Sequence, residues 1–190
     1  MNKNYLHLLI ALAVWLTCAL TASAADTYDF TANNLQFVIT GTNTCKVVGH
    51  VLDSPSGGYA IHSTVTNSAT GTEYRVTEIG QGAFKNCDRI TSVTINPNVE
   101  RISENAFAGC SALTRVTFPN TLTRIGRYSF ENCTSLAQVV IPNSVTYVDG
   151  MAFSGCSGLT SVDLGENCRF RDSSGWPMNI FLGCTSLTDI

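Results

Sequence analysis

Five cysteines recur along the second half of the chain at a nearly constant interval. Cys87, Cys110, Cys133 and Cys156 lie 23 residues apart, and Cys184 follows after a longer interval. Evenly spaced cysteines can form disulfides, bind a metal ion, act as nucleophiles or pack in a core. The choice among these decides what kind of molecule the sequence describes.

The N-terminus predicts export, which places the cysteines in an oxidising compartment. Lys3 gives a positive start, residues 6–20 are almost wholly apolar, and Ala22-Ser23-Ala24 is a small-residue cleavage site. This is the pattern of a secretory signal peptide over residues 1–24. An uncleaved anchor is the alternative, but the apolar run is too short for a good membrane span. We expect a secreted or cell-surface protein with no membrane span after cleavage.

The phase of the cysteines favours packing in a core. Each of the five lies three residues after a phenylalanine and three before a leucine or isoleucine. Free cysteine is commonly buried and behaves as a small hydrophobe. Disulfides are the alternative, since exported proteins form them. However, neighbouring side chains in a stack would point in parallel, which disfavours the disulfide dihedral, and seven cysteines after cleavage leave one over.

Metal and catalytic chemistry have little support in the sequence. There is no C-x-x-C, and His50 and His62 are the only histidines after the signal peptide. The HExxH, G-x-S-x-G and P-loop motifs are missing. A cysteine–histidine pair needs a histidine beside an exposed thiol, whereas Cys45, outside the repeat, alternates with Val47 as in a buried strand. We expect no catalytic residue, cofactor or metal; an enzyme or redox protein with an exposed thiol is the alternative.

The cysteines belong to a repeat that governs the sequence from Ile79 onward. Full copies begin at Ile79, Ile102, Ile125 and Val148, and a partial fifth copy follows an insertion within 165–175. One unit cannot bury its own apolar residues, whereas stacked units bury them as continuous ladders. The apolar columns are Phe84, Phe107, Phe130, Phe153 and Phe181; Ile90, Leu113, Leu136, Leu159 and Leu187; Val93, Val116, Val139, Val162 and Ile190; Ile95, Phe118, Ile141 and Leu164; and Val99, Leu122, Val145 and Cys168.

Local patterns within the repeat predict its elements. The L-x-x-V-x-I segment alternates apolar residues and predicts a short strand, which would pair in parallel with the next copy about 4.8 Å away. The A-F-x-x-C segment spaces apolar residues by three, which predicts one helical turn. Pro119 and Pro142 end the strand, because proline cannot donate to a ladder.

The repeated unit A-F-x-x-C-x-x-L-x-x-V-x-[IF]-P-x-x-[VL]-x-x-I-G resembles the BspA-like leucine-rich repeat family. The resemblance covers Ile79 to Ile190. It implies a right-handed, strand-rich solenoid with short helical turns over residues 79–190, comprising four full repeats and a partial fifth. Family members are secreted or surface proteins of host-associated bacteria, with relatives in parasitic protists. The resemblance therefore also implies interaction with host proteins or other cells.

Residues 25–78 resemble the family's N-terminal lead-in more loosely. Four segments read as strands separated by Asn, Gly, Ser and Pro turns, and "AIHSTVT" looks like a degenerate copy of "VIPNSVT" with His62 at the proline position. We expect a β-rich cap over the open end of the solenoid, which terminal repeats require for solubility. No matching cap follows the fifth copy, which stops within its strand at Ile190.

The repeat also presents regular exposed columns. On the strand segment these are Ser92, Arg115, Gln138 and Ser161, then Thr94, Thr117, Val140 and Asp163. After the proline, Arg101, Arg124 and Tyr147 are predicted to form a contiguous strip. Arginine and tyrosine are enriched at binding hot spots. We take Arg101, Arg124, Tyr147, Arg115 and Gln138 as candidate binding residues; a merely solvated face is the alternative.

These observations favour a non-enzymatic protein-binding or adhesion module outside the cell. The expected partner is an extracellular or host protein, or a glycan. The formal net charge of -3 provides no basic footprint for nucleic acid and no polybasic patch for a membrane. The second hypothesis is a structural spacer or a fragment of a larger surface protein with no ligand of its own. Fold alone does not decide between the two.

Overall fold

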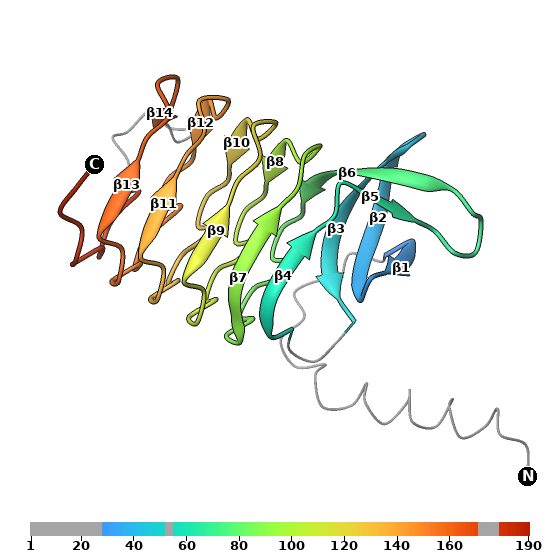
Figure 1. The fold of residues 1–190 in the computed structure, drawn as a ribbon, viewed down its shortest axis with the longest axis horizontal. Coiled ribbons are helices and arrows are strands. Elements are labelled where there is room, and N and C mark those ends of the chain that lie inside the picture. Colours follow the sequence, from blue (N-terminus) through green and yellow to red (C-terminus); the bar gives the residue numbers. More distant parts are fainter. Residues whose placement is uncertain (1–27, 52–54, 171–178) are drawn as a thin grey trace, which may run out of the picture.

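The computed structural model describes residues 28–51, 55–170 and 179–190. The expected signal peptide, Trp176 and part of the expected insertion lie outside these residues. Within them the chain consists of strands and turns, with no helix. Figure 1 shows the strands of the repeats arranged in two rows that extend away from an N-terminal sheet.

Each repeat contributes one strand to each row. The first row contains β4 (Gly57–Ile61), β7 (Ile90–Ile95), β9 (Arg115–Thr117), β11 (Gln138–Val140) and β13 (Ser161–Asp163). The second row contains β6 (Glu73–Ile79), β8 (Arg101–Ile102), β10 (Arg124–Ile125), β12 (Tyr147–Val148) and β14 (Arg169–Phe170). Successive strands pair in parallel, as in Val139 opposite Val162, except that β9 and β11 are not paired. The pairing confirms the predicted strand segment and its register.

Stacked phenylalanines form the centre of the core. Phe84, Phe107, Phe130 and Phe153 are each 0% exposed. Their neighbouring ring centroids lie 5.1–5.2 Å apart with nearly parallel planes, and Phe181 continues the stack half-buried at 5.8 Å. Full burial of each ring stabilises the fold by roughly 1.5–3 kcal/mol, before any gain from ring stacking.

Most members of the other predicted apolar columns are buried through the four full repeats. Phe118, Leu164, Cys168 and Leu187 are only partly buried. Ile190, predicted to continue the valine column, is 67% exposed because no described repeat covers it. The core prediction is therefore confirmed in the full repeats and wrong at Ile190.

The column cysteines are free thiols, and the packing prediction is confirmed for them. Cys87, Cys110, Cys133 and Cys156 are buried, and Cys184 is half-buried. The structure also shows a hydrogen bond that the sequence did not indicate. Each column thiol after Cys87 donates to the backbone carbonyl of the phenylalanine in the preceding repeat. The Sγ to O distances are 3.2 Å for Cys110 to Phe84, 3.3 Å for Cys133 to Phe107, 3.1 Å for Cys156 to Phe130 and 3.2 Å for Cys184 to Phe153.

The A-F-x-x-C segment is not helical, so the prediction of a helical turn is wrong. Left-handed residues interrupt it on both sides of the phenylalanine, such as Tyr128 (φ 56°) and Asn132 (φ 57°) around Phe130. Alternate amides consequently point out of the turn. The Phe130 N–H donates to the Ala152 carbonyl at 2.8 Å, and the Asn132 N–H donates to the Ser154 carbonyl at 2.8 Å. These amides bond to the next repeat, whereas a helix would bond them within the turn.

The N-terminal region forms a sheet that continues into the second row of strands. β1 (Phe30–Ala32) and β2 (Leu35–Gly41) form a hairpin, and β2 pairs with β3 (Thr44–His50). β6 pairs with β3, with β5 (Thr64–Thr66) and with β8. The expected boundary between residues 78 and 79 thus falls inside β6, and one sheet spans it. In the first row, Ile61 lies opposite Ile95, which is the register that the degenerate copy predicts.

His50 joins this sheet to the first repeat. Its ring stacks on Phe84 with centroids 6.3 Å apart, and its Nε2 lies 3.2 Å from the Cys87 thiol. Cys87 belongs to the first full repeat, and Phe84 of the same repeat is the first phenylalanine of its column. The imidazole therefore continues both the aromatic column and the thiol hydrogen bonds by one step.

Candidate binding surface

The second row of strands aligns three of the predicted binding residues. Arg101 of β8 lies opposite Arg124 of β10, which lies opposite Tyr147 of β12. Arg169 of β14 extends the line beyond Tyr147. Arg101 and Arg169, at the two ends of the line, are exposed. The predicted contiguity of Arg101, Arg124 and Tyr147 is confirmed, and we refer to these residues with Arg169 as the arginine strip.

An ion pair occupies the middle of the arginine strip. The Arg124 guanidinium donates from Nε at 2.9 Å and from Nη2 at 2.7 Å to Oδ2 of Asp149 in the following repeat. The Arg124 side chain is 44% exposed, so solvent screens this pair and its contribution to stability is small. The pair neutralises the central cation of the strip, which reduces its attraction for an anionic partner.

The structure does not bring the other two candidate residues to the arginine strip. Arg115 and Gln138 lie on β9 and β11 in the first row, where the neighbouring strands belong to different sheets from β8, β10 and β12. Both side chains are exposed. The five candidate residues therefore occupy two surfaces.

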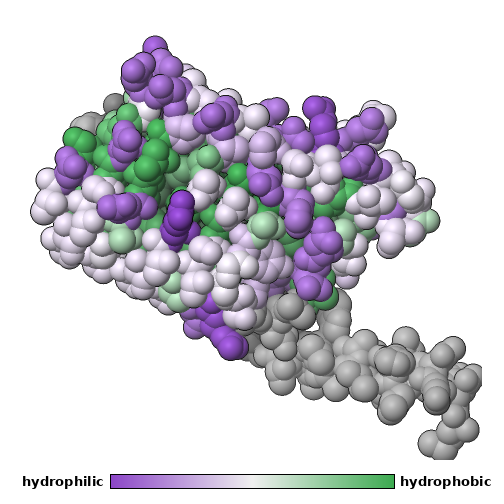
Figure 2. Space-filling model, in the orientation of Figure 1, coloured by the Kyte–Doolittle hydropathy of each residue, from purple (hydrophilic) through white to green (hydrophobic). Residues whose placement is uncertain are grey.

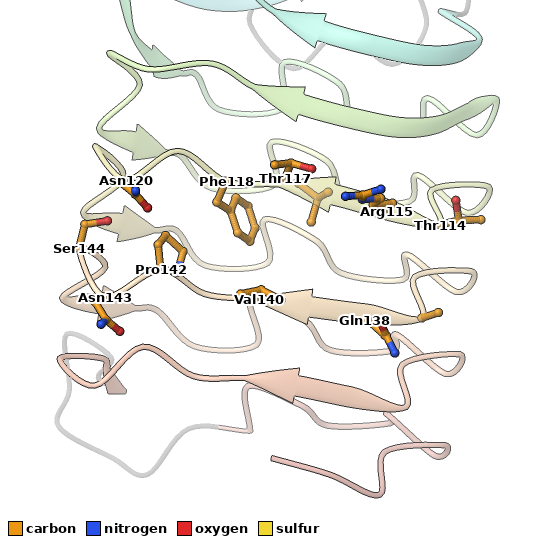
Figure 3. A pocket seen from close by; sticks show the side chains of 12 residues that line it. Thr114, Arg115, Thr117, Phe118, Asn120, Gln138, Val140, Pro142, Asn143 and Ser144 are labelled. Carbon is orange, nitrogen blue, oxygen red and sulfur yellow. The ribbon is translucent and has the colours of Figure 1, made fainter.

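Arg115 and Gln138 line a groove between β9 and β11 (Figure 3). Its volume is about 850 Å³. Figure 3 shows Arg115 and Gln138 toward one end, Asn120, Asn143 and Ser144 toward the other, and Phe118 between the two strands. The lining residues are Thr114, Arg115, Val116, Thr117, Phe118, Asn120, Ala137, Gln138, Val140, Pro142, Asn143 and Ser144.

A break in the first row explains why the groove lies at this junction. At other junctions a threonine bonds to the preceding repeat, as Thr160 does to the Ala137 carbonyl through its N–H at 2.9 Å and its hydroxyl at 3.0 Å. Ala137 has no hydroxyl, and an N–H bond from it to Thr114 is missing among the described backbone bonds. Phe118 also replaces the smaller Ile95 and Ile141 of its column and is only partly buried.

The groove combines an apolar hollow with polar ends. Val140 is 62% exposed, and it lies near Phe118 and Pro142 in the groove lining (Figure 3). Figure 2 shows apolar surface gathered over the C-terminal part of the repeats, around the ends of β11 and β13. The Ser144 hydroxyl at the rim is buried and has no protein partner.

Most of these groove residues are not among the predicted binding residues, although the columns of the repeat contain signals for them. Phe118 is the single aromatic residue of its column, and Val140 is the single aliphatic residue among exposed polar column mates. Ala137 similarly interrupts a column of threonines at positions 91, 114 and 160. Deviations from the repeat, rather than the repeat itself, mark the groove.

The Cys87 thiol beside His50 is not set up as a nucleophile. The structure brings His50, from the N-terminal sheet, next to Cys87 of the first full repeat. The Cys87 thiol is 3% exposed, and burial together with the Asp88 carboxylate raises its pKa to about 12. A thiol in this state is protonated at neutral pH and is a poor nucleophile. The contact therefore serves packing and hydrogen bonding.

The described residues contain no group of three or more His, Cys, Asp or Glu side chains placed to hold a metal ion. No helix within the described part of the chain has the length and apolar character needed to cross a membrane.

A family model for the BspA type leucine rich repeat region matches residues 77–190 in six copies. The chain belongs to the BspA-type leucine-rich repeat family. The match begins two residues before the first full repeat identified from the sequence, within β6. The strand pairing, the phenylalanine stack and the thiol hydrogen bonds described above are thus features of a BspA-type repeat array in this chain.

Solved structures of bacterial proteins share the fold of this BspA-type chain. A leucine-rich repeat protein from Bacteroides ovatus superposes with a TM-score of 0.68 at 24% identity, over 84% of this chain and 46% of that protein. The T. pallidum leucine rich repeat protein gives 0.69 at 23% identity, over 84% and 79% of the two chains. A leucine rich cell surface protein from Faecalibacterium prausnitzii gives 0.54 at 24% identity, over 88% and 55%.

The chain spans less than half the length of the Bacteroides ovatus protein. A comparison with curated protein sequences gave no match. The comparisons therefore establish the family and the strand-rich fold.

Proposed function

We propose that the chain is an exported, non-enzymatic repeat protein of the cell surface that binds a protein partner through the first row of strands. The observation that carries this proposal is the groove between β9 and β11, where exposed apolar and polar side chains meet at a break in the sheet. Apolar patches rimmed by polar residues are typical of interaction sites. The right-handed solenoid, capped by residues 25–78, acts as the rigid scaffold that presents this face.

Three further observations support the proposal. The N-terminal sequence has the pattern of a signal peptide. One structural relative is described as a leucine rich cell surface protein. The raised thiol pKa values and the missing catalytic motifs favour binding over catalysis.

A spacer without a ligand is the second candidate function. The observation that favours it is the share of Ser and Thr on the rest of the first row, exemplified by Ser92, Thr94 and Ser161. Such side chains are typical of a solvated face. A spacer would hold neighbouring parts of a surface protein at a fixed distance, and substitutions in the groove would then have no effect on binding.

A binding screen with surface-specific variants tests the proposed function. The chain from Ala25 to Ile190 would be screened against extracellular-matrix proteins and a glycan array. We expect saturable binding to a protein, weakened at least tenfold by Arg115→Glu in the groove. Arg124→Glu reports on the arginine strip, and Arg75→Glu, an exposed reversal on β6, is the matched control. Circular dichroism checks that each variant is folded; no binding by the folded chain would favour the spacer.

A further inference from the structure

The β9–β11 junction differs from the other junctions of the first row in a way that creates a recognition site. β4, β7 and β9 form one sheet and β11 and β13 form another, although Arg115 and Gln138 are separated by the same 23 residues as paired neighbours elsewhere. At this junction alone among the full repeats, Ala137 replaces a threonine and Phe118 replaces an aliphatic residue of its column. The local sequence therefore sets this junction apart from the surface that the repeat would otherwise present.

The exposed columns on either side of the groove have the spacing of an extended peptide. Arg115 and Thr117 point to the same face of β9, as Gln138 and Val140 do on β11, because alternate residues of a strand share a face. Two residues of a strand span about 6.8 Å. A peptide in extended conformation along the groove therefore places side chains i and i+2 over these two columns.

The two columns differ in the chemistry that they select. Among the described residues that line the groove, Arg115 carries the single charge, and no carboxylate opposes it there. The Arg115–Gln138 column therefore attracts a carboxylate, to which a guanidinium binds with two parallel hydrogen bonds. The second column offers Val140, 62% exposed, with Phe118 beside it in the lining, which suits an aliphatic side chain.

The charge beside the groove fixes which side chain goes to which column. Asp163 of β13 lies directly opposite Val140 and is exposed. Its carboxylate repels an acidic side chain over the Val140 column, since like charges placed opposite one another across strands are destabilising. The groove thus discriminates between the two orders of the same pair of side chains, which is a basis for specificity.

A glycan fits this groove less well than a peptide. Phe118 is the one aromatic residue in the lining, and it is partly buried against the Phe130 ring at a centroid distance of 5.7 Å. A single partly buried ring leaves little aromatic surface on which a sugar ring can stack. The side-chain amides of Gln138 and Asn120 supply donors and acceptors for a peptide backbone. Asn143, whose Oδ1 accepts from the Glu166 N–H, adds its amide donors.

We propose that the β9–β11 groove binds an extended peptide segment of a partner protein that carries a carboxylate side chain and an aliphatic side chain two residues apart. The carboxylate pairs with Arg115 and the aliphatic side chain packs on Val140. This inference rests on the proposed protein-binding function and specifies the chemistry of its site.

Synthetic peptides test the inference directly. Fluorescein-labelled Asp-x-Leu peptides in a Ser/Thr context would be titrated with the chain and compared with Lys-x-Leu and Asp-x-Ser peptides by fluorescence anisotropy. We expect the Asp-x-Leu peptide to bind at least tenfold more tightly than either. Arg115→Glu should weaken it tenfold or more and shift the preference toward Lys-x-Leu, Val140→Ser should weaken it several-fold, and Arg75→Glu should leave it unchanged.

The outcomes separate this inference from the proposed function. If a protein from the binding screen binds equally well to wild type, Arg115→Glu and Val140→Ser, the groove inference is wrong, and protein binding stands but through another surface of the chain. If no protein and no peptide binds the folded chain, both are wrong. Equal binding of all three peptides, or displacement of the Asp-x-Leu peptide by an acidic oligosaccharide alone, also overturns the inference.

Discussion

The column cysteines show how a single residue type satisfies two requirements of the repeat. Each must fill a small apolar space beside the phenylalanine stack, and several also donate to a buried phenylalanine carbonyl, as Cys133 does to Phe107. Alanine or valine would leave that acceptor without its thiol partner, and serine would place a more strongly polar group in the core. The chemistry that first drew attention to these residues is therefore structural, and their interval follows from the repeat.

Ser129 places a buried polar group in the core without a hydrogen-bond partner. It is 0% exposed, its hydroxyl has no hydrogen-bond partner, and its column mates are Ala83, Ala106 and Ala152. An unpartnered buried hydroxyl carries a desolvation cost of roughly 1–3 kcal/mol. We predict that Ser129→Ala raises the free energy of unfolding by about 1 kcal/mol, measured by urea denaturation.

The control for Ser129 is Ser135→Ala on the exposed surface of the same repeat. Removing an exposed hydroxyl changes stability by no more than about 0.5 kcal/mol. A loss of stability in Ser129→Ala, with Ser135→Ala unchanged, would show that the Ser129 hydroxyl has a partner in solution and that our account of its cost is wrong.

At the scale of elements, the periodicity of the sequence predicted the strands and the buried columns. It did not predict the turns, whose shape depends on the backbone conformation of single residues. The strand through Val162 and the ring stack through Phe153 follow from apolar columns, because burial has the period of the repeat. The conformation around Phe130 requires positive φ at Tyr128 and Asn132. Residues other than glycine adopt positive φ uncommonly, so their types did not indicate this turn. Apolar spacing by three could not distinguish their turns from a helix.

The candidate site was only partly predictable for a related reason. Arg115 and Gln138 could be assigned to an exposed column, and the strip through Arg101, Arg124 and Tyr147 could be aligned. The groove itself results from a missing strand pairing, which depends on side-chain volume and hydrogen bonding at one junction. Repeat averaging conceals such a local difference.

The phenylalanine stack allows a graded prediction for one element of the repeat. Phe130 packs between Phe107 and Phe153 at 5.2 Å on both sides, and Phe118 meets its edge. We predict that Phe130→Ala lowers the free energy of unfolding by about 3–5 kcal/mol, because it removes a fully buried ring and leaves a cavity. Phe181→Ala should cost less than half as much, since that ring is only partly buried and stacks on one neighbour.

Urea unfolding of the two phenylalanine variants, followed by circular dichroism, measures both losses. Equal losses would indicate that position in the stack does not matter, and a midpoint for Phe130→Ala equal to that of wild type would contradict the assigned register.

At the scale of the whole molecule, stability is distributed along the array. Each repeat contacts its neighbours through the same ladders, so the free energy of unfolding is approximately a sum of repeat and interface contributions. The charged fraction of 13% is low, and Arg124–Asp149 is the ion pair within the described residues. Conditions that act on the buried thiols therefore act on every repeat at once, whereas salt has little to screen.

This distribution predicts a marked loss of stability in alkali. Burial raises the pKa of Cys45, Cys87 and Cys110 from about 9.0 to about 12 in the folded chain. Because the folded pKa lies above the unfolded one, the stabilisation is fully present below pH 9 and is lost as the pH rises toward 12. Each of these thiols lowers the free energy of unfolding by about 1.4 kcal/mol per pH unit in that window.

We expect urea midpoints that are level from pH 7 to 8.5 and fall steeply above pH 9. Cys110→Ala, less stable at neutral pH, should show a shallower fall. Rapid labelling of the native thiols by Ellman's reagent at pH 8, or a midpoint independent of pH up to 10.5, would contradict burial of these thiols.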